Sequence, residues 1–288
     1  MTKIAPEHFS PNMRSIIRSV KLGMIKIAVI VAVSFAQCIA GASEVWAQDG
    51  GVQLTGAFGV DYTNGNYGTD RNTDILLDLS SLSAQIGNLK ISASVPYMRI
   101  SGRGLIVFDA AGNPIVINRK TSIAPDVRSG FGDLNLSATY TIPAAILSEF
   151  QVELTGRVKL PTASERRRLS TGEADFGMNV DVSRQMGIWG PFVTIGYLIP
   201  GQPSIFSLYN TVFVSMGTTV ELDKNLVAVL SYDQDSASAR QVGGSREMLG
   251  SISWIISNSI TLTGYGTAGL SSGSPSVGTG LIVSYGFN

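Results

Sequence analysis

The sequence has 288 residues, of which 44% are hydrophobic and only 15% are charged, with 32 glycines, one histidine and one cysteine. Basic and acidic residues number 21 each, so the formal net charge is zero. This balance argues against a nucleic-acid-binding protein, which carries a basic excess or basic clusters. The low charge and the high glycine content also argue against a disordered chain.

The first 47 residues have the features of a secretory signal peptide. Lys21 and Lys26 precede an apolar run from Ile27 to Ala36, which is followed by small residues and then by Val45-Trp46-Ala47. The run is about ten residues long, whereas a helix needs roughly 20 to span a bilayer. A basic segment, a short apolar segment and a small-residue cleavage site together predict export from the cytoplasm.

We expect cleavage after Ala47, with Ala42 as the competing site. The long segment before the apolar run leaves the start of the protein open among Met1, Met13 and Met24. His8 and Cys38 both lie in the segment that is removed, so the mature chain, residues 48–288, holds no histidine and no cysteine. This argues against disulfides, thiolate or imidazole catalysis and the usual zinc sites.

The mature chain alternates apolar and polar residues, which is the pattern of β-strands with two different faces. In one run the apolar positions are Phe150, Val152, Leu154, Gly156, Val158 and Leu160. No long amphipathic helix interrupts the pattern. We read twelve such runs: 52–62, 73–86, 89–102, 130–142, 150–161, 174–186, 190–200, 207–221, 225–235, 247–257, 260–270 and 276–287.

The lengths of these runs predict an all-β protein, an antiparallel transmembrane barrel of twelve strands. Strands of soluble proteins usually have about 5–6 residues, whereas a tilted strand needs roughly 9–11 to cross a membrane. The connections alternate between long and short, and tight-turn residues occupy three short ones: Gly87-Asn88, Asp223-Lys224 and Asn258-Ser259. Short periplasmic turns, long outer loops and an even number of strands are typical of barrels in the outer membrane of Gram-negative bacteria.

Two further features fit this location. The last run places Tyr285 and Phe287 on one face, which resembles the terminal-strand signal that the barrel-assembly machinery reads. Arg166, Arg167 and Arg168 are adjacent in an expected outer loop, where they would suit the phosphates of lipopolysaccharide or form an ordinary solvated loop.

If the apolar face of each strand contacts lipid, the other face lines the interior. Charged residues then become candidates for lining the lumen: Asp61, Asp74, Asp78, Lys90, Asp133, Glu153, Arg157, Lys159, Asp175 and Asp181. Buried charges require partners or water. The interior is therefore either a braced, salt-bridged filling or a hydrated path whose charges select solutes.

The longest outer loop contains a small apolar hairpin. Leu105–Phe108 and Pro114–Ile117 are separated by residues 109–113, which include Asp109, Gly112 and Asn113. The hairpin either folds into the barrel as a constriction or projects outward, and the pattern alone leaves both directions open.

Three short motifs resemble those of the outer-membrane transporter family of the MetA pathway of phenol degradation. They are SGFGDLNL at Ser129–Leu136, KLPT at Lys159–Thr162 and TGEADF at Thr171–Phe176. Ala163 stands where a glycine commonly follows the Pro-Thr pair in that family. The resemblance implies an outer-membrane barrel with a role in the uptake of aromatic or other hydrophobic compounds.

We therefore predict a passive channel for small, hydrophobic or aromatic solutes, with no enzyme activity, no cofactor, no metal and no nucleic-acid partner. Its expected partners are outer-membrane lipid, lipopolysaccharide, the barrel-assembly machinery and the solutes. The alternative is a non-conducting barrel with a structural or adhesive role. The two differ in whether the interior holds a continuous path.

Overall fold

The computed structural model describes residues 51–67, 72–102, 105–112, 114–117, 127–143, 149–204, 207–239 and 243–287. The expected signal peptide, residues 1–47, lies outside this part of the chain, so its cleavage stays a prediction.

The described residues form strands joined by turns and loops, with one short 3-10 helix at Glu165–Arg167. None of the described residues forms a helix that is long and apolar enough to cross a membrane. The strands are β1 (Gln53–Gly65), β2 (Thr73–Ile86), β3 (Leu89–Ser101), β4 (Leu105–Phe108), β5 (Pro114–Ile117), β6 (Val127–Phe131), β7 (Leu134–Ile142), β8 (Gln151–Leu160), β9 (Asp175–Ser183), β10 (Trp189–Ile199), β11 (Thr211–Asp223), β12 (Leu226–Asp235), β13 (Arg246–Ser257), β14 (Ile260–Gly269) and β15 (Val277–Phe287).

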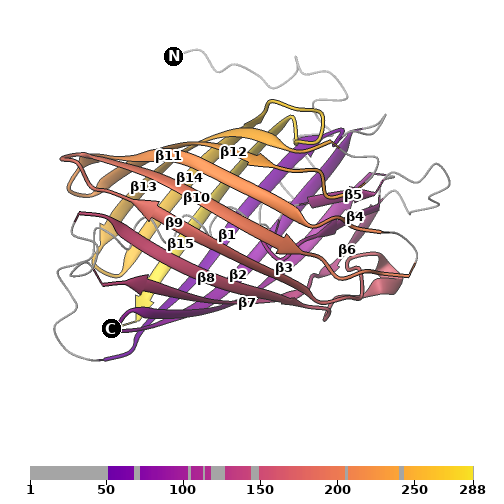
Figure 1. Ribbon diagram of the computed structural model, residues 1–288, viewed down its shortest axis with the longest axis horizontal. Coiled ribbons are helices and arrows are strands. Elements are labelled where there is room, and N and C mark those ends of the chain that lie inside the picture. The colour runs from indigo at the N-terminus through magenta and orange to yellow at the C-terminus, as the bar shows by residue number, and fades with distance from the viewer. Residues whose placement is uncertain are drawn as a thin grey trace, which may run out of the picture.

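The sheet closes on itself into a barrel of tilted antiparallel strands (Figure 1). Each wall strand pairs with its neighbours in the sequence, and β1 also pairs with β15 along almost its whole length, from Leu54 opposite Phe287 to Asn64 opposite Val277. β6 and β7 together fill one position, because both pair with β3. The wall therefore has twelve positions, which confirms the fold expected from the alternation.

The wall position shared by β6 and β7 is broken at Gly132 and Asp133. The N–H of Gly132 donates to the carbonyl of Pro96, at 2.7 Å, and Pro96 has no N–H of its own. A Cβ atom at Gly132 would lie 2.3 Å from Cε of Met98 and 2.7 Å from Cγ of Pro96, so a larger residue would require these side chains to shift. The single run expected over 130–142 is thus two strands, and the first of them begins three residues earlier, at Val127.

The two ends of the barrel differ. We call the end where β1 starts at Gln53 and β15 finishes at Phe287 the turn end, and the opposite end the loop end. Two predicted tight turns, Gly87-Asn88 and Asn258-Ser259, lie at the turn end as expected. The third turn is Lys224-Asn225, one residue later than predicted, because Asp223 still pairs with Leu226. The long connections and the hairpin of β4 and β5 lie at the loop end (Figure 1).

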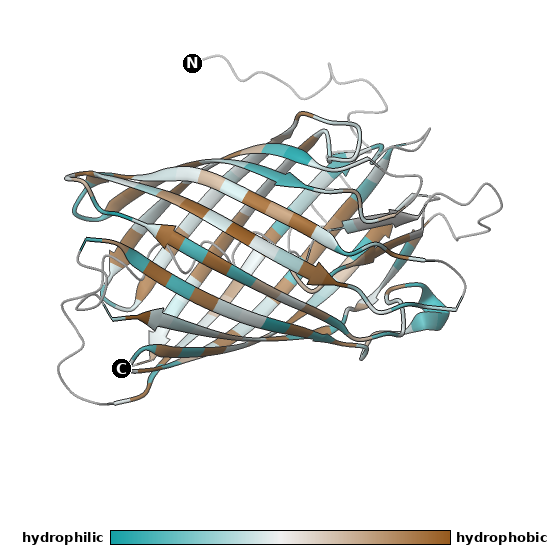
Figure 2. Cartoon of the chain, in the orientation of Figure 1, coloured by the Kyte–Doolittle hydropathy of each residue, from teal (hydrophilic) through white to brown (hydrophobic). Residues whose placement is uncertain are grey.

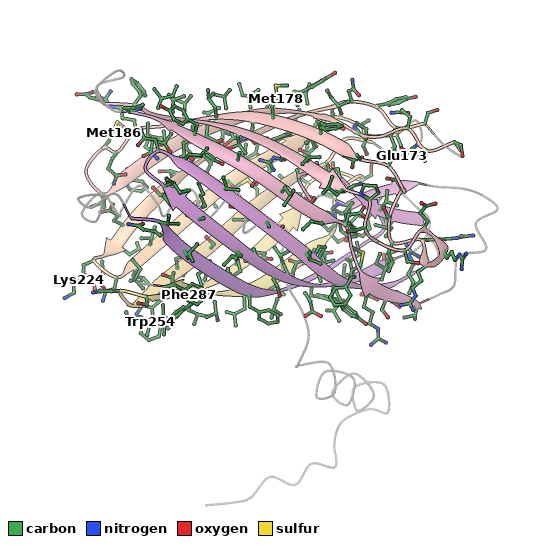
Figure 3. The ribbon with its side chains drawn as sticks, turned by 90° about the horizontal axis from the view of Figure 1, so that it is seen from below. Glu173, Met178, Met186, Lys224, Trp254 and Phe287 are labelled. Carbon is green, nitrogen blue, oxygen red and sulfur yellow. The ribbon has the colours of Figure 1, made fainter. Side chains whose placement is uncertain are left out.

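The outer and inner faces of the wall have opposite chemistry. On β9, Phe176, Met178 and Val180 point outward and are 55%, 60% and 42% exposed. The alternate residues of the same strand point inward, and of these Asp175 and Asn179 are 1% and 4% exposed. Apolar residues therefore alternate along the strands of Figure 2, and Met178, Trp254 and Phe287 stand away from the wall in Figure 3. Such an outer face suits lipid, and closure leaves no unpaired strand edge there.

A cation in the middle of the outer face should be costly. Leu281 lies outward at the middle of β15, and Val277 lies on the same face at the strand's first position. We expect Leu281→Arg to lower the free energy of unfolding in lipid vesicles by about 2–4 kcal/mol, and Val277→Arg by about 0–1 kcal/mol. Denaturant titration of the two variants measures this. Equal losses would contradict a lipid-facing outer band.

Candidate functional site

A buried ion cluster joins three parts of the chain near the loop end. Nζ of Lys159, on β8, lies 2.6 Å from Oδ2 of Asp175 and 3.6 Å from Oδ2 of Asp133. The same ammonium group donates to the backbone carbonyl of Phe108, the last residue of β4, at 2.9 Å. Lys159 and Asp175 are each only 1% exposed. This single cation therefore ties the hairpin to two neighbouring wall positions.

The two carboxylates of this cluster also accept hydrogen bonds from other groups. Asp133 accepts the backbone N–H of Ala163 at 2.9 Å and the hydroxyl of Ser170 at 2.7 Å. Asp175 accepts the N–H of Gly201 at 2.9 Å. A buried ion pair is stable only when its remaining hydrogen-bonding capacity is satisfied. The cluster consequently fixes the loops that follow β8 and β10 as well as the hairpin.

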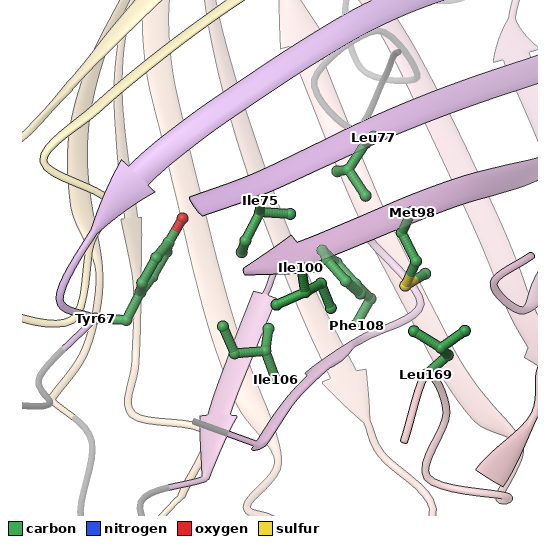
Figure 4. Packing of buried hydrophobic residues seen from close by; sticks show 8 residues of the cluster. All are labelled: Tyr67, Ile75, Leu77, Met98, Ile100, Ile106, Phe108 and Leu169. Carbon is green, nitrogen blue, oxygen red and sulfur yellow. The ribbon is translucent and has the colours of Figure 1, made fainter. Parts of the chain in front are cut away.

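The hairpin of β4 and β5 lies inside the barrel. Its side chains Ile106 and Phe108 pack against the inner face of β2 and β3 and against two loop residues (Figure 4). All members of this apolar cluster are at most 7% exposed: Tyr67, Ile75, Leu77, Met98, Ile100, Ile106, Phe108 and Leu169. Of the two directions that the sequence left open, the structure shows the inward one. The hairpin therefore narrows the interior at the loop end.

Tyr67 closes one side of the apolar cluster in the loop after β1. Its hydroxyl donates to Oγ1 of Thr63 at 2.8 Å. Burial raises the pKa of Tyr67, so the hydroxyl remains a donor under physiological conditions. The cluster thus includes this polar group without leaving it unsatisfied.

Polar side chains line the wall between the hairpin and the turn end. Arg157 donates to Asn179, which in turn donates to Asp181, and Thr194 donates to the other oxygen of Asp181. Closer to the turn end, Glu153 accepts from Gln151 at 2.9 Å. These contacts connect β8, β9 and β10 on the inner face.

A second apolar cluster lies on a different part of the inner face. It contains Leu79 of β2, Leu249 of β13, Tyr265 of β14 and Ile282 of β15, all at most 7% exposed. The hydroxyl of Tyr265 donates to Oδ2 of Asp61 at 2.7 Å. Leu79 continues the inward row of Ile75 and Leu77, so three successive inward positions of β2 are apolar.

Charged residues form two groups on the inner face near the loop end. On β6 to β9, the cations Arg128, Arg157 and Lys159 lie together with the carboxylates Asp133, Asp175 and Asp181. A second group, on β1, β12 and β13, consists of the acidic residues Asp61, Asp233, Asp235 and Glu247. The sequence interpretation omitted Asp233, Asp235, Glu247 and Arg128. Asp233 and Asp235 could have been assigned to the inner face from the sequence. They alternate with Tyr232 and Gln234 and fall on the same face of the strand as Ser231.

Eight of the ten expected lining residues lie on the inner face or, in the case of Asp133, in the break beside it: Asp61, Lys90, Asp133, Glu153, Arg157, Lys159, Asp175 and Asp181. Asp74 and Asp78 do not, because Leu77 is the residue paired with Asp61 and faces inward, which turns both aspartates to the outer face. Asp74 accepts hydrogen bonds there from Tyr62 at 2.6 Å and Asn64 at 2.8 Å. The prediction that these two residues line the lumen is corrected accordingly.

The remaining candidates lie at opposite ends of the barrel. Arg166 and Arg167 are exposed in the loop-end segment after β8, and Arg168 is half-buried with a left-handed backbone, φ 56°. Tyr285 and Phe287 lie outward at the turn end of β15, 46% and 51% exposed, with ring centroids 5.0 Å apart. Within the described ranges, no three histidine, cysteine or acidic residues are grouped so as to hold a metal ion.

The fold resembles that of solved outer-membrane proteins. No family model matches the sequence, and no curated protein matches it significantly. The COG4313 outer membrane channel from Pseudomonas putida F1 superposes with a TM-score of 0.64 at 12% identity, over 85% of this chain and 98% of that one. The NanC porin gives a TM-score of 0.49 at 10% identity, over 83% of this chain and 100% of its own. At these identities the first likeness shows the barrel fold, and the second adds nothing to it.

The buried cation should hold the hairpin in place. Lys159→Met leaves two buried carboxylates without their positive partner, and we expect it to cost about 3–5 kcal/mol of stability. Hydrogen exchange at residues 105–112 should rise at the same time. Lys224→Met, at an exposed turn, serves as the control and should change neither quantity. Unchanged exchange in the hairpin of Lys159→Met would show that the apolar cluster alone holds it.

Proposed function

We propose that this protein is a channel of the Gram-negative outer membrane that passes small solutes by passive diffusion. The observation that carries the proposal is the closed barrel with an apolar outer face, a charged inner face and a hairpin folded inside it. Charged side chains that line a narrowed interior act on any solute that passes between them. The Pseudomonas putida protein of similar fold is an outer membrane channel, which agrees with this role.

We propose further that the solutes are hydrophobic or aromatic. The inner face carries two apolar clusters, and Leu77 and Leu79 are adjacent members of them along β2. Sites for small organic molecules combine such apolar surface with a few fixed polar groups, here the hydroxyl of Tyr265 and the carboxylate of Asp61. The likeness of the three motifs to the phenol-pathway transporters supports the same class of solute.

A non-conducting barrel is the second candidate, and the tight burial of inner polar side chains favours it. Thr155, Asn179, Ser231 and Ser253 point inward, and each is at most 4% exposed. A braced interior of this kind stabilises the wall without offering a path. The two candidates therefore make opposite predictions for ion conduction.

Single-channel recording in planar bilayers separates them. A channel narrowed by the hairpin should give discrete conductance steps, and replacing residues 105–117 with a short Gly-Ser linker should increase their size. A small aromatic solute should interrupt the current, whereas a sugar at equal concentration should not. Circular dichroism of the variant controls for loss of the barrel. Background current from both proteins would reject the channel and favour the non-conducting barrel.

The expected partners at the two ends also remain part of the proposal. Arg166 and Arg167 are exposed at the end that we assign to the cell exterior, where lipopolysaccharide phosphates lie. Tyr285 and Phe287 are exposed on the last strand, where the assembly machinery would bind.

Binding to purified lipopolysaccharide tests the arginine assignment. Each of Arg166→Ala and Arg167→Ala should weaken the binding of the detergent-solubilised protein by about two- to fivefold, because an exposed ion pair contributes modestly. The effect should shrink as salt is added. Lys224→Ala, at the turn end, should leave the affinity unchanged, and a loss as large in this control would remove the assignment.

A further inference from the structure

An unpaired arginine lies on the outer face of the wall near the loop end. Arg99 of β3 is exposed, and it alternates with Met98 and Ile100, which point inward and are buried. Within the part of the chain that the structure describes, Arg99 forms no hydrogen bond and no ion pair. A guanidinium group keeps its charge at every physiological pH. On a surface that meets lipid, such a charge is stable only beside an anion or water.

Two more arginines approach the same place from the loop after β8. Ser129 of β6 is the cross-strand partner of Arg99, and the Cα atoms of such partners are about 5 Å apart. The backbone carbonyl of Ser129 accepts a hydrogen bond from Nη1 of Arg167 at 3.4 Å. Arg166, the preceding residue of the 3-10 helix, is exposed. Arg99 and Arg167 therefore lie on the two sides of Ser129.

The acidic residues nearby do not occupy Arg99. Asp74 and Asp78 lie outward on β2, each one diagonal step from Arg99, because Leu76 is its direct partner. Diagonal neighbours are roughly 7–8 Å apart. Asp74 also accepts hydrogen bonds from two side chains of β1. Glu165, the first residue of the 3-10 helix, lies against a glycine at the far end of its own loop. The guanidinium group of Arg99 is therefore available to an external anion.

An aromatic pair continues this surface toward the turn end. Tyr97 and Phe131 are paired across β3 and β6, one outward position below Arg99. Their ring centroids are 5.3 Å apart at an interplanar angle of 86°, and Phe131 is 67% exposed. Further along β3 the outward positions are apolar, from Val95 to Ile91. Cations, then aromatic rings, then aliphatic side chains follow one another in the order of a lipid's phosphate, interface and acyl chains.

We propose that the outer face of β3 and β6 binds a lipopolysaccharide molecule by a phosphate of its lipid A part. Arg99 and Arg167 donate to the phosphate oxygens, which match the planar fork of a guanidinium group. Tyr97 and Phe131 pack against the adjoining acyl chains. The inference rests on the proposed placement of the loop end at the cell exterior, and it adds a site on the wall to the arginines of the outer loop. It does not require the barrel to conduct.

Titration of the full detergent-solubilised chain with lipid A, followed by microscale thermophoresis, tests the proposal. We expect Arg99→Gln to weaken binding by about fivefold and Phe131→Ala by about threefold. Lipid A stripped of its phosphates should bind more weakly, and Arg99→Gln should not weaken that form further, because the variant and the ligand then lack the same contact.

Arg246→Gln is the matched control. Arg246 is an exposed, outward arginine near the loop end of β13, five wall positions from β3. This variant should leave the affinity for lipid A unchanged. Near-ultraviolet circular dichroism shows whether each variant keeps the native packing.

Four results would overturn the proposal. They are unchanged lipid A binding by Arg99→Gln, an equal loss in Arg246→Gln, equal affinity for phosphatidylglycerol, and displacement of lipid A by inorganic phosphate at equal concentration. The last two would show a surface that binds any phosphate. Lipid A binding with the expected losses, in a protein whose conductance stays at background, would reject the channel and leave this site intact.

Discussion

Backbone hydrogen bonding is the constraint on which the rest of this structure depends. The hydrocarbon of a bilayer offers no partner for an N–H or a C=O group, so a sheet can cross it only when its first and last strands meet. Here β1 and β15 meet over eleven residue pairs, from Leu54–Phe287 to Asn64–Val277. Closure then decides which side chains face lipid and which face one another, and the alternation of the sequence supplies both sets.

The motifs that suggested a transporter family are brought together by the pairing of neighbouring strands, β7 with β8 and β8 with β9. Each of the three contributes one charged residue to the buried cluster: Asp133, Lys159 and Asp175. Their shared contact is with the hairpin, because Lys159 also donates to the carbonyl of Phe108. The charged residues of the motifs therefore hold the hairpin in place inside the barrel. Gly132 also contributes, because the backbone at this position packs closely against Met98. None of these residues needs a catalytic role to explain its position.

The strands could be predicted from the sequence because alternation is a local property, and their number followed from it. Contacts between segments far apart in the sequence could not be predicted in this way. The hairpin folds inward because it packs on apolar residues of the inner face of β2 and β3, such as Ile75 and Leu77. In the sequence these residues cannot be distinguished from residues that face lipid, since both sets are equally hydrophobic. The same ambiguity reversed the faces of Asp74 and Asp78. In β12, by contrast, Asp233 and Asp235 follow the polar parity, so these inner charges could have been identified from the alternation alone.

Cysteine scanning of β9 tests the central claim that one face of this wall meets lipid and the other faces the interior. Single cysteines at positions 175–183, in a background where Cys38 is replaced by serine, can be spin-labelled after reconstitution into vesicles. We predict that collisions with a lipid-soluble relaxation agent alternate along the strand, high at Phe176, Met178, Val180 and Val182 and low at the positions between them. A uniform profile, or a period close to 3.6 residues, would contradict this claim.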